Sequence, residues 1–521
     1  KAKMMKTEEA TRPHEDDDNV EKFVLVMGSC GLDRLLFVPT YPRPDEKVRT
    51  TAYHEVGGGN AANTASAMAL LSDASLFLRH DTKKKKKRLK IQLATKLGND
   101  HVGKQLVEEL HHANVDTSSP LFRLGEEGTT TAFTSIIVST DENTRTCIHT
   151  PGTCGELTAT DVTQTNDYLN DILENVIHIH LDCRHSSAQL AVAKEAKKRR
   201  IPISVDVEKD RYSKDVDGLL ELANLVFTNS QQIDRYLARL TEEYQLERGG
   251  VGGIIQEPTI TSDLSTNNDG DDDLIMLYAN AIKPNVFFNR HFGQKDKHVI
   301  ITKGGLGALH VKCMSFDKVE DDAGSESPSV INEIHITSLD NSSDSAGANE
   351  ASNSQIILVQ HKFTDQIMIR EDSATTCNNR LILAIFSAEY EIKSTGVLSD
   401  IDIVDTTGAG DAFIGGYLMM YFHTLLQQQQ QVHASSAIAN RDDSNTKDKA
   451  HDHDNGNHNE FCWQEYEMVK TCMQFGSWVG GKKLAGPGSR SALPKGSEVD
   501  DNLGYDLHQI RRSLDNLISN F

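Results

Sequence analysis

Two carboxylates on either side of a small-residue turn are the strongest chemical signal in the chain. Asp405 and Asp411 flank Thr-Thr-Gly-Ala-Gly in the stretch IVDTTGAGDAFIGGY. An apolar run precedes the turn and apolar residues follow it at helical spacing, which predicts a strand, a turn and a helix start. A helix start offers unpaired N–H groups, and small residues such as Gly408, Ala409 and Gly410 let an anion approach them closely. A carboxylate beside such a site suits a base that takes a proton from an attacking hydroxyl.

Asp411 has a second interpretation that these residues alone leave open. Aspartate often caps a helix, and glycines often form a tight turn between a strand and a helix. The remainder of the chain must separate the capping role from the catalytic one.

The segments around this motif alternate between two patterns. Five short runs are almost continuously apolar, as parallel buried strands are, at Phe23–Ser29, Val176–Asp182, Ile201–Val207, Ala223–Asn229 and His298–Gly305. Helical patterns lie between them, in NAANTASAMALL, HVGKQLVEELHHA, SSAQLAVAKEAKKRR and, after the motif, DAFIGGYLMMYFHTLL. This order predicts an α/β fold with a doubly wound, mostly parallel sheet flanked by helices.

Two further runs, Lys47–Val56 and Thr130–Thr150, alternate between polar and apolar residues. Alternation predicts a small, half-exposed antiparallel sheet attached to the main layer. The basic run KKKKKR at 83–88 lies between the strand-like segments ASLFLR and LKIQLATKLG. We therefore interpret it as the loop of a hairpin rather than as a nucleic-acid patch.

Charge and hydropathy limit the partners of the chain. The 521 residues carry a formal net charge of −22, which disfavours general binding to nucleic acid or to an anionic membrane. There is no run of 18 or more apolar residues, and the first twenty residues lack the apolar core of a signal peptide. The eight cysteines contain no Cys-x-x-Cys pair, so neither a zinc site nor a disulfide framework is indicated. We expect a cytoplasmic protein with a small-molecule substrate, no nucleic acid and no membrane.

Composition also divides the chain into segments. Residues 1–20 are predicted to be a disordered tail, and low-complexity insertions are predicted at about 245–297, 316–355 and 427–460. Without them, residues 21–495 form one domain of ordinary α/β size, followed by a helical segment at 496–521.

Three motifs, in order, resemble the signatures of the PfkB, or ribokinase-like, family of sugar kinases. DTTGAGDAF at 405–413 is similar to the family's carboxy-terminal signature, GGGNAANTASAMALL at 57–71 to its amino-terminal signature, and GSCGLD at 28–33 to the position of its first substrate aspartate. TRTCIHTPG, ISVDVEKDR and FGSWVGGKK most resemble ketohexokinase and plant PfkB-type kinases. The resemblance implies a ribokinase-like fold with a small β-sheet lid, and transfer of a phosphoryl group from ATP, with Mg²⁺, to a sugar hydroxymethyl group.

The resemblance also implies a role for each matching residue. Asp411 would be the general base, and the amides of Gly408, Ala409 and Gly410 would form the anion hole. The sugar would be bound by Asp33, Gly59, Asn60, Asn63 and Asp411, because carboxylates and amides pair with hydroxyls. By residue type alone, Asp33 could instead be a turn residue and Asn63 a satisfied helix residue.

Nucleotide and cation roles follow in the same way. ATP would be bound by Arg145, Thr302, Lys303, Gly304 and Gly305, together with Gly408, Ala409 and Gly410. Asp405 and Thr407 match positions that bind a monovalent cation such as K⁺. The chain departs from the family at Asn229, because many members follow this Asn with a Glu that helps to place Mg²⁺, and here the residue is Gln232.

We favour an ATP-dependent kinase whose acceptor is a ketose such as fructose. A kinase for ribose, a nucleoside or another small alcohol is the first alternative. A non-catalytic scaffold that binds partners through its acidic insertions is the second, and the presence of Asp411 counts against it. In related kinases the lid sheet often pairs between subunits, which implies a homodimer here.

Overall fold

The structure is a computed structural model that describes most of the chain. It covers residues 21–77, 79–80, 86–87, 89–142, 144–163, 166–207, 213–229, 232, 235, 259–262, 298–302, 308–315, 330–338, 356–364, 379–388, 404–442 and 458–502. The predicted tail at 1–20, and Lys303, Gly304 and Gly305, lie outside these residues.

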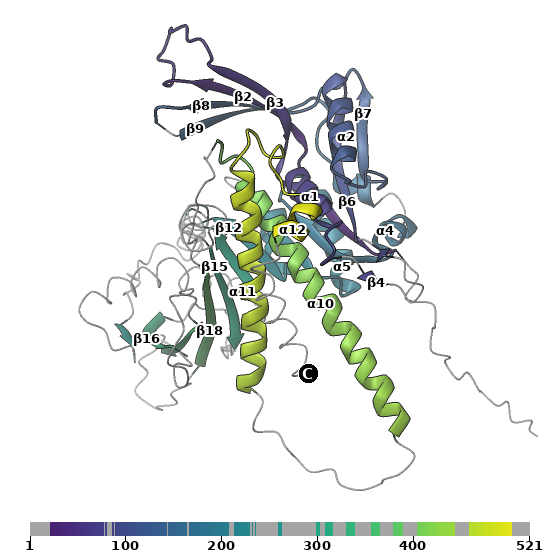
Figure 1. Ribbon diagram of the computed structural model, residues 1–521, viewed down its shortest axis with the longest axis vertical. Helices are drawn as coiled ribbons and strands as arrows, with labels where there is room; N and C mark the ends of the chain where they lie inside the picture. Colours follow the sequence, from purple (N-terminus) through teal and green to yellow (C-terminus); the bar gives the residue numbers. More distant parts are fainter. Residues whose placement is uncertain are drawn as a thin grey trace, which may run out of the picture.

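A twelve-stranded sheet forms the centre of the protein (Figure 1). Seven neighbouring strands are parallel, in the order β14 (His298–Thr302), β12 (Leu225–Asn229), β11 (Ile203–Asp206), β10 (Val176–Leu181), β1 (Phe23–Met27), β6 (Lys90–Asn99) and β7 (Phe122–Glu127). Antiparallel pairing then extends the sheet beyond β14 through β15 (Ala308–Ser315), β18 (Asn379–Ala388), β17 (Ile356–Thr364) and β16 (Val330–Ser338), and β13 (Thr259–Ser262) is parallel to β16. The predicted mostly parallel sheet is confirmed.

Helices cover both faces of the parallel strands, and the alternation of β1 shows why. Val24 and Val26 pack in one core cluster, whereas Leu25 and Met27 pack in the other, because successive side chains of a strand point to opposite faces. The first cluster includes α1 (Asn60–Leu71), α2 (His101–His112), α10 (Ala409–Asp442), α11 (His458–Lys483) and α12 (Gly496–Asn502). The second includes α3 (Ala159–Val162), α4 (Asn166–Leu173), α5 (Ser186–Lys198) and α6 (Lys214–Leu222).

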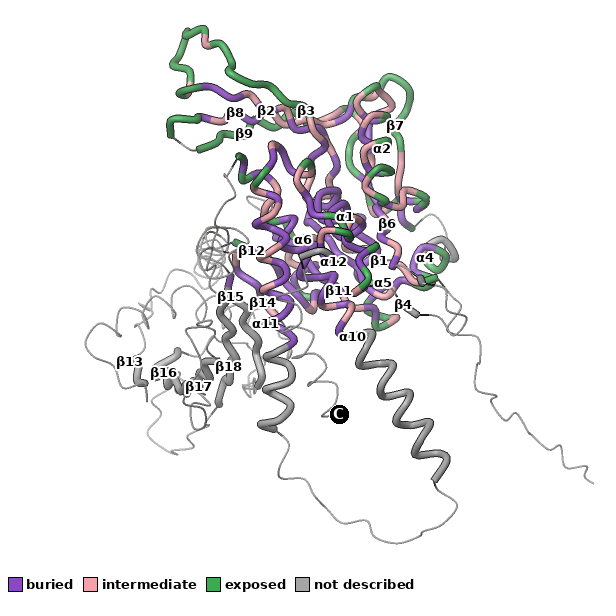
Figure 2. The backbone as a smooth tube through the Cα atoms, in the orientation of Figure 1, coloured by how far each residue is buried: buried purple, intermediate pink, exposed green. Residues whose placement is uncertain are grey.

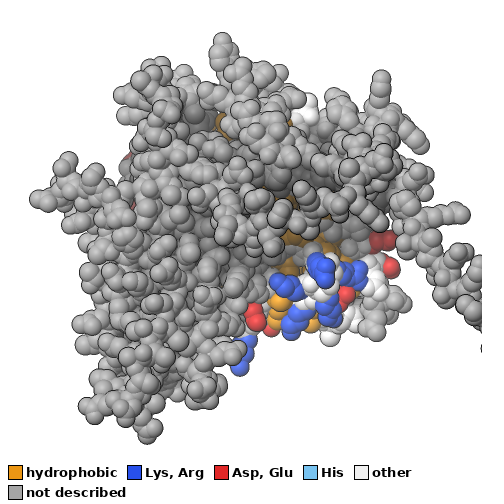
Figure 3. All heavy atoms as spheres, turned by 90° about the horizontal axis from the view of Figure 1, so that it is seen from below, with side chains coloured by type: hydrophobic (Ala, Val, Ile, Leu, Met, Phe, Trp, Pro, Cys, Tyr) orange, Lys and Arg blue, Asp and Glu red, His pale blue; other side chains and the backbone are white. Residues whose placement is uncertain are grey.

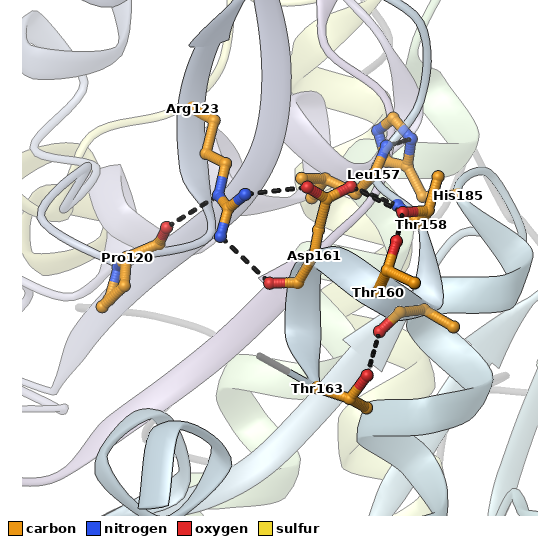
Figure 4. A network of polar contacts seen from close by, with 9 residues as sticks. Pro120, Arg123, Leu157, Thr158, Thr160, Asp161, Thr163 and His185 are labelled. Carbon is orange, nitrogen blue, oxygen red and sulfur yellow. Dashed lines mark hydrogen bonds and ion pairs between the residues drawn. The ribbon is translucent and has the colours of Figure 1, made fainter. Parts of the chain in front are cut away.

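A polar network anchors the segment before α3 against the start of α5 (Figure 4). Arg123 on β7 forms an ion pair with Asp161, with 2.8 Å between Nη1 and Oδ1. The N–H of Leu157 donates to Nδ1 of His185 at 3.1 Å, so Nε2 of the same ring is the donor toward the carbonyl of Gly28 at 3.1 Å. This network therefore fixes the chain that leaves β1 at Gly28.

A separate four-stranded sheet, named the lid sheet below, stands at the top of Figure 1. Its order is β3 (Ala52–Gly58), β2 (Gly31–Val38), β8 (Phe133–Ser139) and β9 (Thr144–Thr150). The prediction of a purely antiparallel sheet was wrong, because β2 pairs with β8 in parallel while β2–β3 and β8–β9 are antiparallel. The sequence analysis predicted no strand at Gly31–Val38 and therefore missed β2. The sheet is half-exposed, as predicted, and every residue of β9 is exposed (Figure 2).

Three other segments refine the sequence predictions. Arg79–His80 (β4) pairs with Lys86–Lys87 (β5), so part of the basic run forms the second strand of a short hairpin. Helix α10 continues through residues 427–442, and α11 starts at His458, within the predicted insertion.

Among the described residues, no helix is long and apolar enough to cross a bilayer. Lys and Arg side chains gather on the described part of the face seen from below, away from the lid sheet (Figure 3).

Two buried histidines on β10 make the fold sensitive to acid. Nε2 of His178 and Nδ1 of His180 both lie within hydrogen-bond distance of the Ser204 hydroxyl, at 2.8 and 2.9 Å. Burial lowers the pKa of His178 to about 3 and that of His180 to about 4, so both rings are neutral in the folded protein at pH 5 to 7. In the unfolded chain, histidine takes up a proton near pH 6.5.

We predict that the free energy of unfolding falls as pH drops below about 6.5 and continues to fall toward pH 4. The unfolded chain binds protons there that the folded chain does not, which costs at most about 1.4 kcal/mol per histidine per pH unit. Urea unfolding at pH 7.5 and pH 5 measures the loss. The double variant His178→Gln and His180→Asn replaces each ring with an amide that keeps a nitrogen for the bond to Ser204. It should remove most of the dependence of the free energy of unfolding on pH. Replacement of the exposed His112 by Gln should leave it intact, and an unchanged slope in the double variant would contradict the assignment.

Candidate active site

The candidate site lies beyond the carboxyl ends of the parallel strands. Ser29 follows β1, Asp182 follows β10, and Asp206 and Thr302 end β11 and β14. Because these strands are parallel, their carboxyl ends share one edge of the sheet, where ligands of open α/β sheets bind. The lid sheet and the starts of α1 and α10 meet at the same edge, as the contacts below show.

The Thr-Gly-Ala-Gly turn has the predicted form, and α10 starts at Ala409. Gly408 has φ of +76°, and a Cβ atom there would lie 2.6 Å from Cβ of Ser489, so both conformation and space require glycine. Gly410 is exposed and has open space at its Cβ position. Within the part of the chain that the structure describes, the N–H groups of Gly408 and Gly410 have no hydrogen-bond partner. Such a turn can receive an anion.

Asp411 lies in the first turn of α10 rather than at the cap position before it, which removes the main ground for the capping interpretation. Its carboxylate Oδ2 accepts a hydrogen bond from Nδ2 of Asn63 on α1 at 2.8 Å. Asp411 is 8% exposed and Asn63 is 3% exposed. Helices α1 and α10 meet closely at Gly415, where an added Cβ would lie only 2.7 Å from Cβ of Ala67. The structure thus joins the predicted base to a residue of the other signature.

Arg490 orients that asparagine, and the sequence analysis missed it. Its Nε donates to Oδ1 of Asn63 at 2.9 Å, and its Nη2 donates to the carbonyl of Gly58 at 2.7 Å. The first bond fixes the amide so that Nδ2 faces Asp411. Arg490 lies in a Gly- and Ser-rich loop after α11, where only its charge set it apart in the sequence.

Asp33, on β2 of the lid sheet, lies on the other side of this arginine. Oγ of Ser489 donates to its Oδ2 at 3.3 Å. Burial raises the pKa of Asp33 to about 6, although the charge of Arg490 and the bond from Ser489 oppose the rise. A Cβ on Gly58 would lie 2.2 Å from Oδ2 of Asp33, so glycine is needed for the carboxylate to fit.

Two aspartates that were not predicted as site residues hold the start of α1. Oδ2 of Asp182 accepts hydrogen bonds from the N–H and the hydroxyl of Ser29, at 2.8 and 2.6 Å. The Ser29 hydroxyl in turn accepts the N–H of Asn60 at 3.0 Å. Asp206 accepts a hydrogen bond from Nδ2 of Asn60 at 3.3 Å. Gly59 precedes the helix with φ of +91°. Both aspartates end apolar strand runs, which is the one signal that could have identified them.

The predicted nucleotide residues are only partly described. Arg145, on β9 of the lid sheet, donates from Nη1 to the hydroxyl of Thr406 beside the turn. This contact brings the lid sheet to the anion-binding turn. Thr302 ends β14, and its hydroxyl donates to the carbonyl of Thr228 at 3.3 Å.

The cation residues are engaged within the chain. Oδ1 of Asp405 accepts the N–H and the hydroxyl of Thr407, at 3.0 and 2.8 Å, and Oδ2 accepts the N–H of Gly488 at 2.7 Å. Oδ1 of Asn229 accepts the N–H of Gln232 at 2.8 Å. The described residues hold no group of three or more His, Cys, Asp and Glu side chains that could bind a metal ion.

Comparison with known proteins agrees with this geometry. The model of the pfkB family carbohydrate kinases matches residues 21–250. An ATP-dependent ribose-1-phosphate kinase from Halopiger xanaduensis is 26% identical over 221 residues, which cover 42% of this chain and 64% of that protein. The chain thus spans just under two thirds of that curated relative.

Two solved structures are similar over most of the chain. Ribokinase from Arabidopsis thaliana, complexed with ribose and ATP, is 14% identical and covers 93% of this chain and 99% of its own, with a TM-score of 0.50. Ribokinase from Giardia lamblia is 13% identical with the same two coverages and a TM-score of 0.49. The Arabidopsis structure shows that the fold is ribokinase-like. The pfkB family model thus covers the segment that carries Asn63, and the structure joins this segment to the second signature through the contact between Asn63 and Asp411.

Proposed function

We propose that the protein is an ATP-dependent phosphotransferase that phosphorylates the hydroxymethyl group of a small sugar. The observation that carries the proposal is the buried Asp411 carboxylate, held by Asn63 next to the Gly408–Gly410 turn. A base beside an anion-binding turn is the arrangement that phosphoryl transfer to a hydroxyl needs.

In the proposed reaction, Asp411 takes the proton of the acceptor hydroxyl. The acceptor oxygen forms a bond to the γ-phosphorus of ATP, the bond from that phosphorus to the β,γ-bridging oxygen breaks, and ADP leaves. Negative charge on the transferring group is then stabilised by the N–H groups of Gly408, Ala409 and Gly410. Of these, Ala409 N already donates to the Thr406 carbonyl at 3.3 Å, so Gly408 and Gly410 are the readier donors.

Asn63 and Arg490 act on the base rather than on the substrate in this proposal. The chain of bonds from Arg490 to Asn63 to Asp411 fixes the orientation of the Asp411 carboxylate toward the acceptor in this proposal.

We propose that Asp33 and Asn60 bind hydroxyl groups of the acceptor. Gly59, which precedes α1, would let the acceptor lie close to the backbone. Asp33 offers a buried carboxylate from the lid sheet, and Asn60 is held by Asp206 from the opposite side. Polar groups that converge in this way from the lid sheet and from α1 discriminate by hydroxyl position, because an unmatched hydroxyl would leave a buried partner unpaired.

Arg145, Thr302, Lys303, Gly304 and Gly305 are the proposed nucleotide residues, and the last three lie outside the described residues. Arg145 is suited to bind a phosphate, because one guanidinium group can donate to two phosphate oxygens at once. Mg²⁺ bound to the phosphates would neutralise part of their charge. Asn229 and Gln232 bring no negative charge, so the described chain has no carboxylate for the metal at that position.

The acceptor is the least determined part of the proposal. The sequence motifs favour a ketose such as fructose, whereas the relatives are named for ribose and ribose 1-phosphate. We therefore take a ribose-type sugar as the first candidate and a ketose as the second.

We also propose that the lid sheet pairs with that of a second subunit. Tyr53 on β3 and Ile148 on β9 support this pairing, because both are exposed and lie at the two edges of the sheet.

A panel of acceptors tests the proposed function directly. With saturating Mg·ATP, we expect ADP release to require an acceptor, and kcat/KM to be at least about tenfold higher for ribose than for fructose, as one or two polar contacts can produce. NMR of the product should show phosphate on the hydroxymethyl oxygen. A preference for fructose would select the second candidate. No acceptor-dependent ADP release with ribose, ribose 1-phosphate, fructose or adenosine would reject the kinase.

The replacement Asp411→Asn tests the base. The amide keeps the size of the side chain and an oxygen for Asn63 but cannot take the proton, so we expect kcat to fall by about 10²- to 10⁴-fold. Calorimetry should give an ATP dissociation constant within about threefold of the wild type, because binding does not need the base. Asp171→Asn, on the exposed side of α4, is the control and should leave both values unchanged. A loss of kcat below tenfold would remove Asp411 from this role.

The raised pKa of Asp33 predicts a pH dependence of acceptor binding. Below about pH 6 the folded protein holds a proton on this carboxylate, which can then no longer accept freely from a sugar hydroxyl. The KM for the acceptor should rise by up to about tenfold per pH unit below pH 6, while kcat at saturating acceptor is unaffected by this group. Ser489→Ala removes a bond to the charged form, so it should move the rise to higher pH. A KM that is flat from pH 5 to 8 contradicts the assignment.

A further inference from the structure

Lys483 is a fully buried cation next to the anion-binding turn, and neither the sequence analysis nor the proposed reaction gives it a role. It is the last residue of α11 and is 0% exposed. Its Nζ donates to the carbonyl of Asp405 at 2.8 Å and to the carbonyl of Gly486 at 3.4 Å. A buried ammonium group is costly unless other groups compensate for its lost hydration, so its position indicates a specific function.

The surroundings of Lys483 are those of a small monovalent cation. Both hydrogen-bond acceptors of its ammonium group are backbone carbonyl oxygens. These oxygens carry no full charge, and such oxygens also coordinate Na⁺ or K⁺. The carboxylates of Asp405 and Asp411 attract its charge, whereas Arg145 opposes it.

The residues that the family resemblance assigns to K⁺ do not fit an added ion here. Both carboxylate oxygens of Asp405 already accept hydrogen bonds from Thr407 and Gly488, and its carbonyl oxygen accepts the ammonium of Lys483. The hydroxyl of Thr407 is engaged with Asp405 as well. A second cation at this place would be repelled by Lys483 at short range.

We infer that the ammonium group of Lys483 takes the place of a monovalent cation behind the anion-binding turn, so that the protein needs no K⁺. It also positions other site residues. Val404 N donates to the carbonyl of Leu484 at 2.9 Å, and Gly488 N binds Asp405, so the loop that carries Ser489 and Arg490 is fastened to the motif around Lys483. Lys483 is thus a positioning residue that also supplies fixed positive charge. This inference rests on the proposed kinase function for its activity readout.

Salt replacement tests the inference in the full chain. At constant ionic strength, turnover is measured with tetramethylammonium chloride as the only monovalent salt, and then with KCl, NaCl or NH₄Cl. The wild type should keep the same turnover within about twofold in all four. Lys483→Met, of similar length and without charge, should lose at least tenfold in tetramethylammonium and regain part of the loss in NH₄Cl or KCl. Lys482→Met, at the neighbouring half-buried lysine over the Trp478 ring, is the control and should behave as the wild type.

A several-fold activation of the wild type by K⁺ would overturn the inference, and so would a Lys483→Met variant that is fully active or that no cation restores. Thermal melting separates this inference from the proposed function, because it needs no acceptor. The wild-type Tm should be the same in KCl and in tetramethylammonium chloride, and KCl should raise the Tm of Lys483→Met. If Lys483→Met does not fold, a wild-type Tm that rises in KCl still overturns the inference.

Discussion

The site depends on how closely α1 and α10 can approach each other. Gly415 lies against Ala67, and Gly416 lies against α11, where a Cβ would be 2.7 Å from a methyl carbon of Val479. A larger side chain at Gly415 would separate α1 from α10, and the 2.8 Å contact between Asn63 and Asp411 could not form. A larger side chain at Gly416 would separate α10 from α11. Gly415 therefore matters to the site as much as the aspartate before it, because it sets the distance over which the two signatures meet.

A second constraint acts from within the sheet. Asp182 contacts no proposed reacting atom, yet it binds the N–H and the hydroxyl of Ser29 and the N–H of Ala61, so one carboxylate fixes both the turn after β1 and the start of α1. Gly28 must be glycine beside it, since a Cβ would lie 1.9 Å from Oδ1 of Asp182. Of the proposed sugar residues, Gly59 and Asn60 are thus held from the interior of the sheet, whereas Asp33, like Arg145, approaches from the more exposed lid sheet.

Local patterns were sufficient for much of the fold and for individual site residues. The buried strands are apolar runs, and the turn before α10 is encoded by Gly-Ala-Gly, which was enough to select Asp411. Asn63 and Asp33 were selected through the resemblance to the PfkB family. Arg490, Asp182 and Lys483 were not selected, because their partners lie 78 to 427 residues away. The parallel pairing of β2 with β8 was missed for the same reason, since alternation within a strand says nothing of its neighbour's direction. The acceptor stayed open because carboxylates and amides specify hydroxyls and not the sugar that carries them.

The separation along the chain between Asp33 and Ser489, 456 residues, affects how the protein is made. Strand β1 is synthesised before the other strands of the parallel sheet, whereas the loop that carries Ser489 and Arg490 comes after α11. A nascent chain can therefore build much of its sheet while the proposed base lacks the Arg490 that orients its asparagine. In the proposed reaction, competence to bind and react arises only after this loop has been synthesised, so a product truncated before Ser489 would be folded in part but inert.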